Sequence, residues 1–298
     1  AVADVVVDNF SQGVTKRLGI DHQSLKKVNS KIITCSISGF GDTEINRPAY
    51  DNLIQGYAGA MSITGTDKDN PVKSGIPIAD LGAGLYAVIG ILSAIQSREK
   101  NDTGEHVDIS MLDTQVSLLT YMATMHFLSG ENPEPIGNQH MNHVPFNSYK
   151  TSDGFIQIGV VAEDFWPSLI KALDLEQLDT EENKLRIGRL KNRENIDEAV
   201  QEVFITNTTE HWLKILQEHR VPCGPINTLS ETFEDADLLK RNMIVEVLQD
   251  SGASVKMPGN PVKISNHDEE FRRSPKLGEH TSEIFKNWLD KDISVDQD

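Results

Sequence analysis

The sequence predicts an α/β protein in which a large domain with a parallel β-sheet is followed by a smaller α+β domain. Residues 1–10 and 31–37 contain β-branched apolar runs typical of buried parallel strands, and helical segments separate them. The pattern changes at residues 146–161, which predict a hairpin around a Ser-Asp-Gly turn. We expect a large domain over residues 1–129, a linker or lid over 130–145, a small domain over 146–232, and a linker that returns to the large domain over 233–298.

Local patterns give the elements of the large domain. Short helices are predicted over residues 11–18 and 21–29, between the two strands. The second strand ends in the loop Ser38-Gly-Phe-Gly41, and ligands of α/β sheets gather at such carboxyl ends of strands. Beyond this loop the sequence predicts helices over residues 50–60 and 80–98, a strand over 106–110 and a long helix over 112–129.

The smaller domain is mainly helical after its hairpin. Residues 193–206 predict an amphipathic helix, because its apolar residues recur at helical spacing: Ile196, Val200, Val203 and Phe204. Residues 209–216 begin with a hydroxyl residue followed by an acidic one, which is typical of a capped helix start. Further helices are predicted over residues 164–173, 176–193 and 281–289, and strands over 245–248 and 255–264.

The composition of the 298-residue chain disfavours several classes of function. Its 28 Lys and Arg residues stand against 45 Asp and Glu residues, which gives a formal net charge of −17. This balance disfavours nucleic acid and anionic membranes as partners. The cysteines Cys35 and Cys223 belong to no Cys/His cluster, so neither a disulfide framework nor a metal site is predicted. We therefore expect a cytoplasmic protein that binds no metal, nucleic acid or membrane.

One acidic residue, Asp80, stands immediately before an apolar run at residues 81–95. The run is shorter than the roughly 20 apolar residues that cross a bilayer, so we expect a buried core helix. Gly82 and Gly84 begin this helix and indicate that something approaches its backbone closely. Asp80 has two interpretations. It is a helix N-cap, which is the commoner role, or it is a carboxylate that acts as a covalent nucleophile.

Five blocks, in order along the chain, resemble the class III CoA-transferases of the CaiB/BaiF type. The blocks are residues 36–41, 47–51, 56–65, 71–80 and 104–113. The resemblance implies a Rossmann-like large domain, an interlaced homodimer, and coenzyme A or an acyl-CoA as substrate with no permanently bound cofactor. It also implies that the chain lacks an N-terminal segment that carries part of the CoA site in the family.

The resemblance implies roles for single residues. Asp80 matches the nucleophile, and Gly82 lies beside it, where it would let the thioester approach. Residues 8–19 match a segment that lies against CoA in the family, and Arg17 suits a phosphate because its guanidinium forks onto two oxygens. The positions expected to contact CoA are Asn9, Phe10, Val14 and Arg17.

Other matches concern the acyl end of the substrate. Met111 falls on a position near the thioester, with ordinary core packing as its alternative. Gly137, Asn138 and Gln139 resemble a glycine-containing loop that covers the active site. His140 and His143 are spaced like metal ligands, but no carboxylate or cysteine accompanies them, so we do not expect metal there.

Tyr50 separates two branches of the resemblance. The racemase branch has a histidine at this position, paired with the aspartate as a two-base system. Tyrosine, with a reference pKa of about 10, is a poor base for that reaction, so Tyr50 favours transfer. Its alternative is a core aromatic residue whose hydroxyl finds a neighbour.

The implied activity is transfer of CoA from an acyl-CoA to a carboxylic acid through an aspartyl-CoA thioester on Asp80. Residues 145–159 look most like transferases that act on dicarboxylates related to succinate and glutarate. Two alternatives stay open. One is a 2-methylacyl-CoA racemase or epimerase on the same fold, and the other is a catalytically impaired, truncated homologue.

Overall fold

The computed structural model describes residues 2–45 and 47–289, which form two compact units. One unit comprises the described residues up to Ser148 together with Gly159–Trp166 and Gln177–Asp197. The other comprises Tyr149–Ile158, Pro167–Glu176 and the described residues from Glu198 onward.

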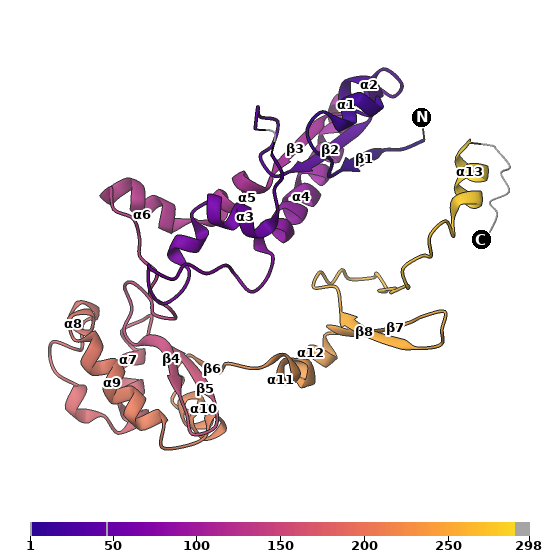
Figure 1. The fold of residues 1–298 in the computed structure, drawn as a ribbon. Coiled ribbons are helices and arrows are strands. Elements are labelled where there is room, and N and C mark those ends of the chain that lie inside the picture. Colours follow the sequence, from indigo (N-terminus) through magenta and orange to yellow (C-terminus); the bar gives the residue numbers. More distant parts are fainter. Residues whose placement is uncertain (1, 46, 290–298) are drawn as a thin grey trace. The chain divides into compact units, whose positions relative to one another are not determined.

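The first unit is built on a parallel sheet with the strand order β1-β2-β3 (Figure 1). The strands are β1 (Val5–Asp8), β2 (Ile33–Ser38) and β3 (His106–Ser110). β2 is the central strand, and Ile33 and Cys35 on it are fully buried. The predicted α/β architecture with a parallel sheet is confirmed.

Two short helices, α1 (Val14–Leu18) and α2 (His22–Lys26), join β1 to β2. α2 begins where the sequence places Asp21, whose carboxylate accepts hydrogen bonds from two backbone N–H groups of the first turn. This is the usual role of an N-cap aspartate, because the first N–H groups of a helix have no partner within it.

The remaining elements of this part of the chain lie after β2 and after β3. They are α3 (Asp51–Tyr57), the 3₁₀ helix η1 (Ala60–Ile63), α4 (Ile78–Asn101), α5 (Met111–Leu118) and α6 (Tyr121–Ser129). The prediction of one long helix over residues 112–129 is wrong. Thr120 has a φ of +50°, and a β-branched residue in that conformation cannot continue a right-handed helix.

α4 also corrects an expectation. It has 24 residues and, by length and composition alone, is long and apolar enough to cross a membrane, although one such helix is weak evidence of a span. It packs against β2, β3, α3 and α5, yet only 28% of its apolar window is buried. Its buried face is made of small residues, Ala79, Gly82, Ala83, Ala87 and Ala94. Its larger apolar residues lie on the other face and are each more than half exposed: Leu81, Leu85, Val88, Ile89 and Leu92.

The small residues explain why α4 lies so close to the sheet. A Cβ atom on Gly90 would stand 2.6 Å from a methyl group of Val107 in β3, so a larger residue would push the helix away. α4 is therefore a core helix on one side only, and Figure 1 shows it running beside β2 and β3.

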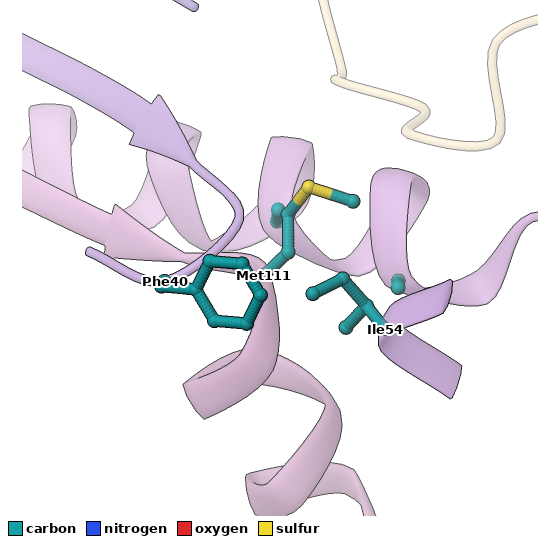
Figure 2. Packing of buried hydrophobic residues seen from close by; sticks show 5 residues of the cluster. Phe40, Ile54 and Met111 are labelled. Atoms are coloured by element: carbon teal, nitrogen blue, oxygen red, sulfur yellow. The ribbon is translucent and has the colours of Figure 1, made fainter. Parts of the chain in front are cut away.

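A buried apolar cluster joins the end of β2 to the beginning of α4. It contains Phe40, Ile54, Ala79, Ala83 and Met111. In Figure 2 the labelled side chains of Phe40, Ile54 and Met111 gather at one place, although they come from three different elements or loops. This packing fixes the N-terminal end of α4 against the carboxyl end of the sheet.

The rest of the chain begins with the predicted hairpin. The elements are β4 (Phe146–Lys150), β5 (Phe155–Gly159), α7 (Phe165–Leu173), η2 (Glu176–Leu178), α8 (Arg186–Lys191), α9 (Arg193–Phe204), α10 (Thr209–Glu218), β6 (Cys223–Pro225), α11 (Leu229–Glu234), α12 (Ala236–Lys240), β7 (Ile244–Leu248), β8 (Ser254–Pro258) and α13 (Thr281–Leu289). β4, β5 and β6 form one sheet and β7 pairs with β8. The amphipathic prediction for α9 is confirmed, since Ile196, Val200 and Phe204 are fully buried. Residues 176–193 are less helical than predicted, and the strand predicted over 255–264 ends at Pro258.

Candidate active site

A cavity of about 610 Å³ opens at the carboxyl edge of the parallel sheet. Its walls come from the residues after β1, the loop after β2, the beginning of α4 and the first residue after β3. Open α/β sheets bind their ligands at this edge, so the position agrees with a binding site. The residues that line it include Phe10, Arg47, Tyr50, Asp80, Gly84 and Met111.

Asp80 lines this cavity and its side chain is exposed. It is the third residue of α4, and the N-cap position is Pro77, which makes no side-chain capping bond. The interpretation of Asp80 as the N-cap is therefore wrong.

Asp51 of α3 does the capping instead. Its Oδ1 atom accepts hydrogen bonds from the backbone N–H groups of Ala79 and Asp80, at 2.8 Å and 3.3 Å. Its Oδ2 atom accepts a hydrogen bond of 2.6 Å from the side chain of Gln55. Gln55 is buried, and its own side-chain oxygen accepts from the backbone N–H of Ser74 at 2.9 Å. Because Asp51 satisfies the beginning of α4, the carboxylate of Asp80 is left to face the cavity.

The environment of Asp80 makes it more basic. Partial burial raises the pKa of the Asp80 carboxyl above its usual value, and the negative charge of Asp51 raises it further. Both effects disfavour the charged form. A carboxylate with a raised pKa is a stronger nucleophile once it is ionised, which suits covalent chemistry.

The two glycines after Asp80 have different surroundings. Gly82 is buried and does not line the cavity: a Cβ atom there would stand 2.9 Å from a methyl group of Thr114 in α5. Gly84 lines the cavity, and a Cβ atom there would meet nothing within 4 Å. Since Gly84 follows Asp80 by one helical turn, it keeps the wall beside that carboxylate open. Gly82 instead allows α4 and α5 to pack closely.

The residues predicted to contact CoA divide into two groups. Asn9 and Phe10 line the cavity, and the Asn9 side-chain amide donates a 2.7 Å hydrogen bond to the carbonyl oxygen of Ile37 at the end of β2. Val14 and Arg17 lie on α1 and line neither this cavity nor the one next to it.

A second cavity of about 650 Å³ shares Phe10 with the first and extends over the polar face of the sheet. Thr34 links two histidines there, because its hydroxyl lies 2.9 Å from Nδ1 of His22 and 2.8 Å from Nδ1 of His106. Burial lowers the pKa of His22, and the nearby His106 and Lys26 lower it further, against an opposing effect of Asp21.

Tyr50 and Met111 both line the first cavity. Tyr50 is the N-cap residue of α3 and is 68% exposed, so it is not a core aromatic residue. Met111 is 6% exposed and belongs to the buried cluster of Figure 2, so it supplies part of the cavity's apolar floor.

The predicted lid residues are held by other loops. The backbone N–H of Gly137 donates to the carbonyl oxygen of Gly65 at 2.7 Å, and the amide of Asn138 donates to the hydroxyl of Ser148 at 2.6 Å. The Gln139 amide reaches Asp197 at 3.5 Å. None of these three residues is among those that line the cavity. Within the described residues, His140 and His143 belong to no group of three or more potential metal ligands.

Three residues of the candidate site were not predicted as site residues from the sequence. Asp51 and Arg47 stand in the same block as Tyr50, so the block was the available signal, but their contacts depend on the fold. Gly84 was noted as a helix-starting glycine, and only the helical phase shows that it, and not Gly82, faces the cavity.

Comparisons with known proteins identify the family of this chain. Residues 1–281 match the family model "CoA-transferase family III". The chain is 31% identical over 293 residues to human succinyl-CoA:glutarate CoA-transferase, covering 97% of this chain and 67% of that protein. It is 33% identical to an acyl-CoA transferase of Fusarium pseudograminearum, covering 95% of this chain and 64% of that protein.

A solved structure extends the likeness to the fold. The crystal structure of a CAIB/BAIF family protein from Brucella suis superposes with a TM-score of 0.83 at 34% identity, covering 95% of this chain and 74% of that one. The chain spans about two thirds of the length of the curated relatives it matches. It belongs to CoA-transferase family III.

Proposed function

We propose that this chain transfers CoA from an acyl-CoA to a carboxylic acid, with Asp80 as the covalent nucleophile. The observation that carries the proposal is the position of Asp80. Its carboxylate faces a cavity at the carboxyl edge of the sheet and is not consumed by helix capping, because Asp51 takes that role. Membership of the CoA-transferase family and the names of the relatives support the same activity.

The proposed reaction balances without a metal, a redox step or a net proton. The Asp80 carboxylate attacks the thioester carbonyl, forms a mixed anhydride and releases the CoA thiolate. The thiolate attacks the aspartyl carbonyl, forms the aspartyl-CoA thioester and releases the donor acid. The acceptor carboxylate attacks the aspartyl carbonyl of this thioester, forms a second mixed anhydride and releases the CoA thiolate. Finally the thiolate attacks the acceptor's acyl carbon, which makes the new acyl-CoA and restores Asp80.

Several lining residues have a place in this scheme. Asn9 and Phe10 support CoA at the end of β1, and Gly84 leaves room for the thioester beside Asp80. Met111 and Ala83 supply an apolar surface that excludes water, which strengthens electrostatic interactions at the reacting atoms.

Tyr50 bears on the competing isomerase activity. A racemase needs two bases, one on each face of the α-carbon. Tyr50 lines the same cavity as Asp80, and a phenol is in general a poor base near neutral pH, so transfer is the better proposal.

The activity is tested by CoA transfer from succinyl-CoA to a panel of carboxylic acids. We expect Asp80→Asn to abolish transfer. Asp113→Asn is the matched control, because Asp113 is also the third residue of a helix and is exposed but lies outside the cavity. Exchange of α-deuterium without acyl exchange would instead identify an isomerase, and the absence of both reactions would identify an impaired homologue.

We also propose a homodimer in the cytoplasm. The support for a dimer is the uncovered apolar face of α4, together with α13, none of whose described residues is buried. A second copy that covers α4 would remove this surface from water. Light scattering should give twice the mass of the chain, and Leu85→Glu should shift it toward the monomer.

The acids themselves are proposed to be dicarboxylates. The human relative is named for succinyl-CoA, which carries a free carboxylate besides its thioester, and for glutarate, which carries two carboxylates. The kinetic comparison of dicarboxylic with monocarboxylic acids in the panel tests this point.

A further inference from the structure

Arg47 lies in the loop between β2 and α3 and lines the cavity that holds Asp80. The central carbon of its guanidinium is 4.8 Å from the ring centroid of Phe40 and 4.7 Å from that of Tyr57. The two rings stand edge to face, with centroids 5.8 Å apart and an interplanar angle of 83°. The guanidinium therefore sits against two perpendicular aromatic rings.

This arrangement orients the arginine without using its hydrogen-bond donors. Ring contacts attract the cation and restrict its rotation, while the N–H groups in the guanidinium plane stay available. Within the described part of the chain, the Arg47 side chain contacts these two rings and forms no ion pair or side-chain hydrogen bond. A guanidinium held in this way is preorganised to bind a planar anion through two parallel hydrogen bonds.

The charges that line the cavity indicate which anion Arg47 would bind. Among the described residues that line it, Arg47 carries the one positive charge and Asp80 the one negative charge. The chain as a whole has a net charge of −17, so an acidic substrate is repelled both by the protein and by its nucleophile. Arg47 is the group that offsets this repulsion inside the cavity.

The loop of Arg47 is tied to the nucleophile. Asp51, the first residue of α3, stands four positions after Arg47 and accepts a hydrogen bond from the backbone N–H of Asp80. Apolar lining residues, Ala83 and Met111, belong to the same cavity. The cavity thus combines a nucleophile, an apolar wall and an oriented cation.

We propose that Arg47 binds the distal carboxylate of a dicarboxylic acyl group while its thioester carbonyl meets Asp80, and that Arg47 thereby selects dicarboxylic over monocarboxylic substrates. Tyr57 is a positioning residue that holds the guanidinium. The inference rests on the proposed function, because it deepens the choice of acid made by the same site.

A phosphate of CoA is the other anion that Arg47 could meet. The pantetheine arm separates the phosphates of CoA from its thioester by the full length of the arm. Since Arg47 shares one cavity with Asp80, where the thioester reacts, the carboxylate of the acyl group is the better match.

Equilibrium binding tests the proposal, in the Asp80→Asn background so that no ligand turns over. The probes are glutaryl-CoA, pentanoyl-CoA, in which a methyl group replaces the distal carboxylate, and free CoA. The parent should bind glutaryl-CoA more tightly than pentanoyl-CoA. Arg47→Gln should weaken the binding of glutaryl-CoA by about 10- to 100-fold, the loss expected for one charge-assisted pair. It should leave the affinities for pentanoyl-CoA and free CoA unchanged.

Further variants separate orientation from charge. Arg47→Lys keeps the positive charge but lacks the two parallel N–H groups of a guanidinium. It should therefore keep part of the preference for glutaryl-CoA over pentanoyl-CoA that Arg47→Gln loses. Tyr57→Ala removes an exposed ring that does not line the cavity, and it should lose part of the preference for glutaryl-CoA. Arg241→Gln, an exposed arginine outside the cavity, is the matched control and should bind all three ligands as the parent does.

Three outcomes would overturn the proposal. If Arg47→Gln weakens the binding of all three ligands equally, Arg47 either contacts a phosphate of CoA or only stabilises the fold. A parent that binds glutaryl-CoA no better than pentanoyl-CoA would show that the distal carboxylate is not recognised. If glutaryl-CoA does not bind to the parent at all, the proposed recognition of the distal carboxylate is likewise wrong. If Asp80→Asn retains transfer activity, the proposed function fails, yet this binding comparison still decides the role of Arg47.

Discussion

Replacing Asp51 with asparagine removes a negative charge beside Asp80 while keeping the shape of the side chain. In the wild-type protein, one oxygen of Asp51 accepts from the Ala79 N–H at 2.8 Å and the other accepts from the Gln55 amide at 2.6 Å. Asparagine can supply an oxygen to only one of them, so its NH₂ group faces a second donor. Gln55 cannot turn over to relieve the conflict, because its oxygen already accepts from Ser74.

The expected cost follows from this donor conflict. One unsatisfied buried group costs about 1–3 kcal/mol, and loss of a charge at a helix start costs about 0.3–1 kcal/mol. We therefore expect Asp51→Asn to lower the free energy of unfolding by about 1–4 kcal/mol. Denaturant unfolding at one fixed protein concentration measures it, since an oligomer's stability depends on concentration.

The same variant has a second, independent readout. The charge of Asp51 helps to raise the pKa of Asp80, so removing it lowers that pKa. In the proposed reaction Asp80 attacks in its ionised form, so activity should be lost as pH falls through its pKa. In Asp51→Asn the acid limb of kcat/KM should therefore move to lower pH, while Asp113→Asn leaves it in place. Unchanged stability together with an unchanged acid limb would refute the assigned role of Asp51.

Three further predictions concern packing and pH. Gly82→Ala should lower the free energy of unfolding by about 1–3 kcal/mol through overpacking, whereas Gly84→Ala should fold normally and lose transfer activity. Unfolding and transfer rates are measured for both variants, and this prediction is wrong if the two variants behave alike. Arg189→Ala should cost about 3–5 kcal/mol in denaturant unfolding, because this buried arginine lies 2.7 Å from Glu163 and its loss leaves unpaired polar groups. The folded pKa of His22 is lowered, so the folded state binds fewer protons than the unfolded one and stability should fall as pH drops below about 6.5; the dependence of Tm on pH should be weaker in His22→Gln, and an identical dependence would exclude His22 as a source.

The parallel sheet and the place of Asp80 near the beginning of α4 could be predicted from the sequence because their signals are local. Strand patterns such as the run before Asn9 depend on a few adjacent residues, and the block ending at Asp80 is contiguous. The capping of α4 could not be predicted, since the carboxylate that accepts from the N–H of Asp80 comes from Asp51, in another helix.

The sequence also could not predict how much of α4 is buried. Its apolar composition indicates a core helix, but composition does not tell which face meets the sheet. Small residues such as Ala83 and Ala87 make the close contacts, and larger ones such as Leu85 stay exposed in the described chain. In the same way, only the fold shows that Arg47 lies against two rings that are apart in sequence.

The proposed mechanism requires that the carboxylate of Asp80 becomes covalently bonded during turnover. Incubation with succinyl-CoA followed by hydroxylamine converts an aspartyl-CoA thioester into an aspartyl hydroxamate, and peptide mass spectrometry then locates the modified residue. We predict the hydroxamate at Asp80, with formation that requires the acyl-CoA. Transfer activity without any hydroxamate at Asp80, or a hydroxamate at a different residue, would contradict the account.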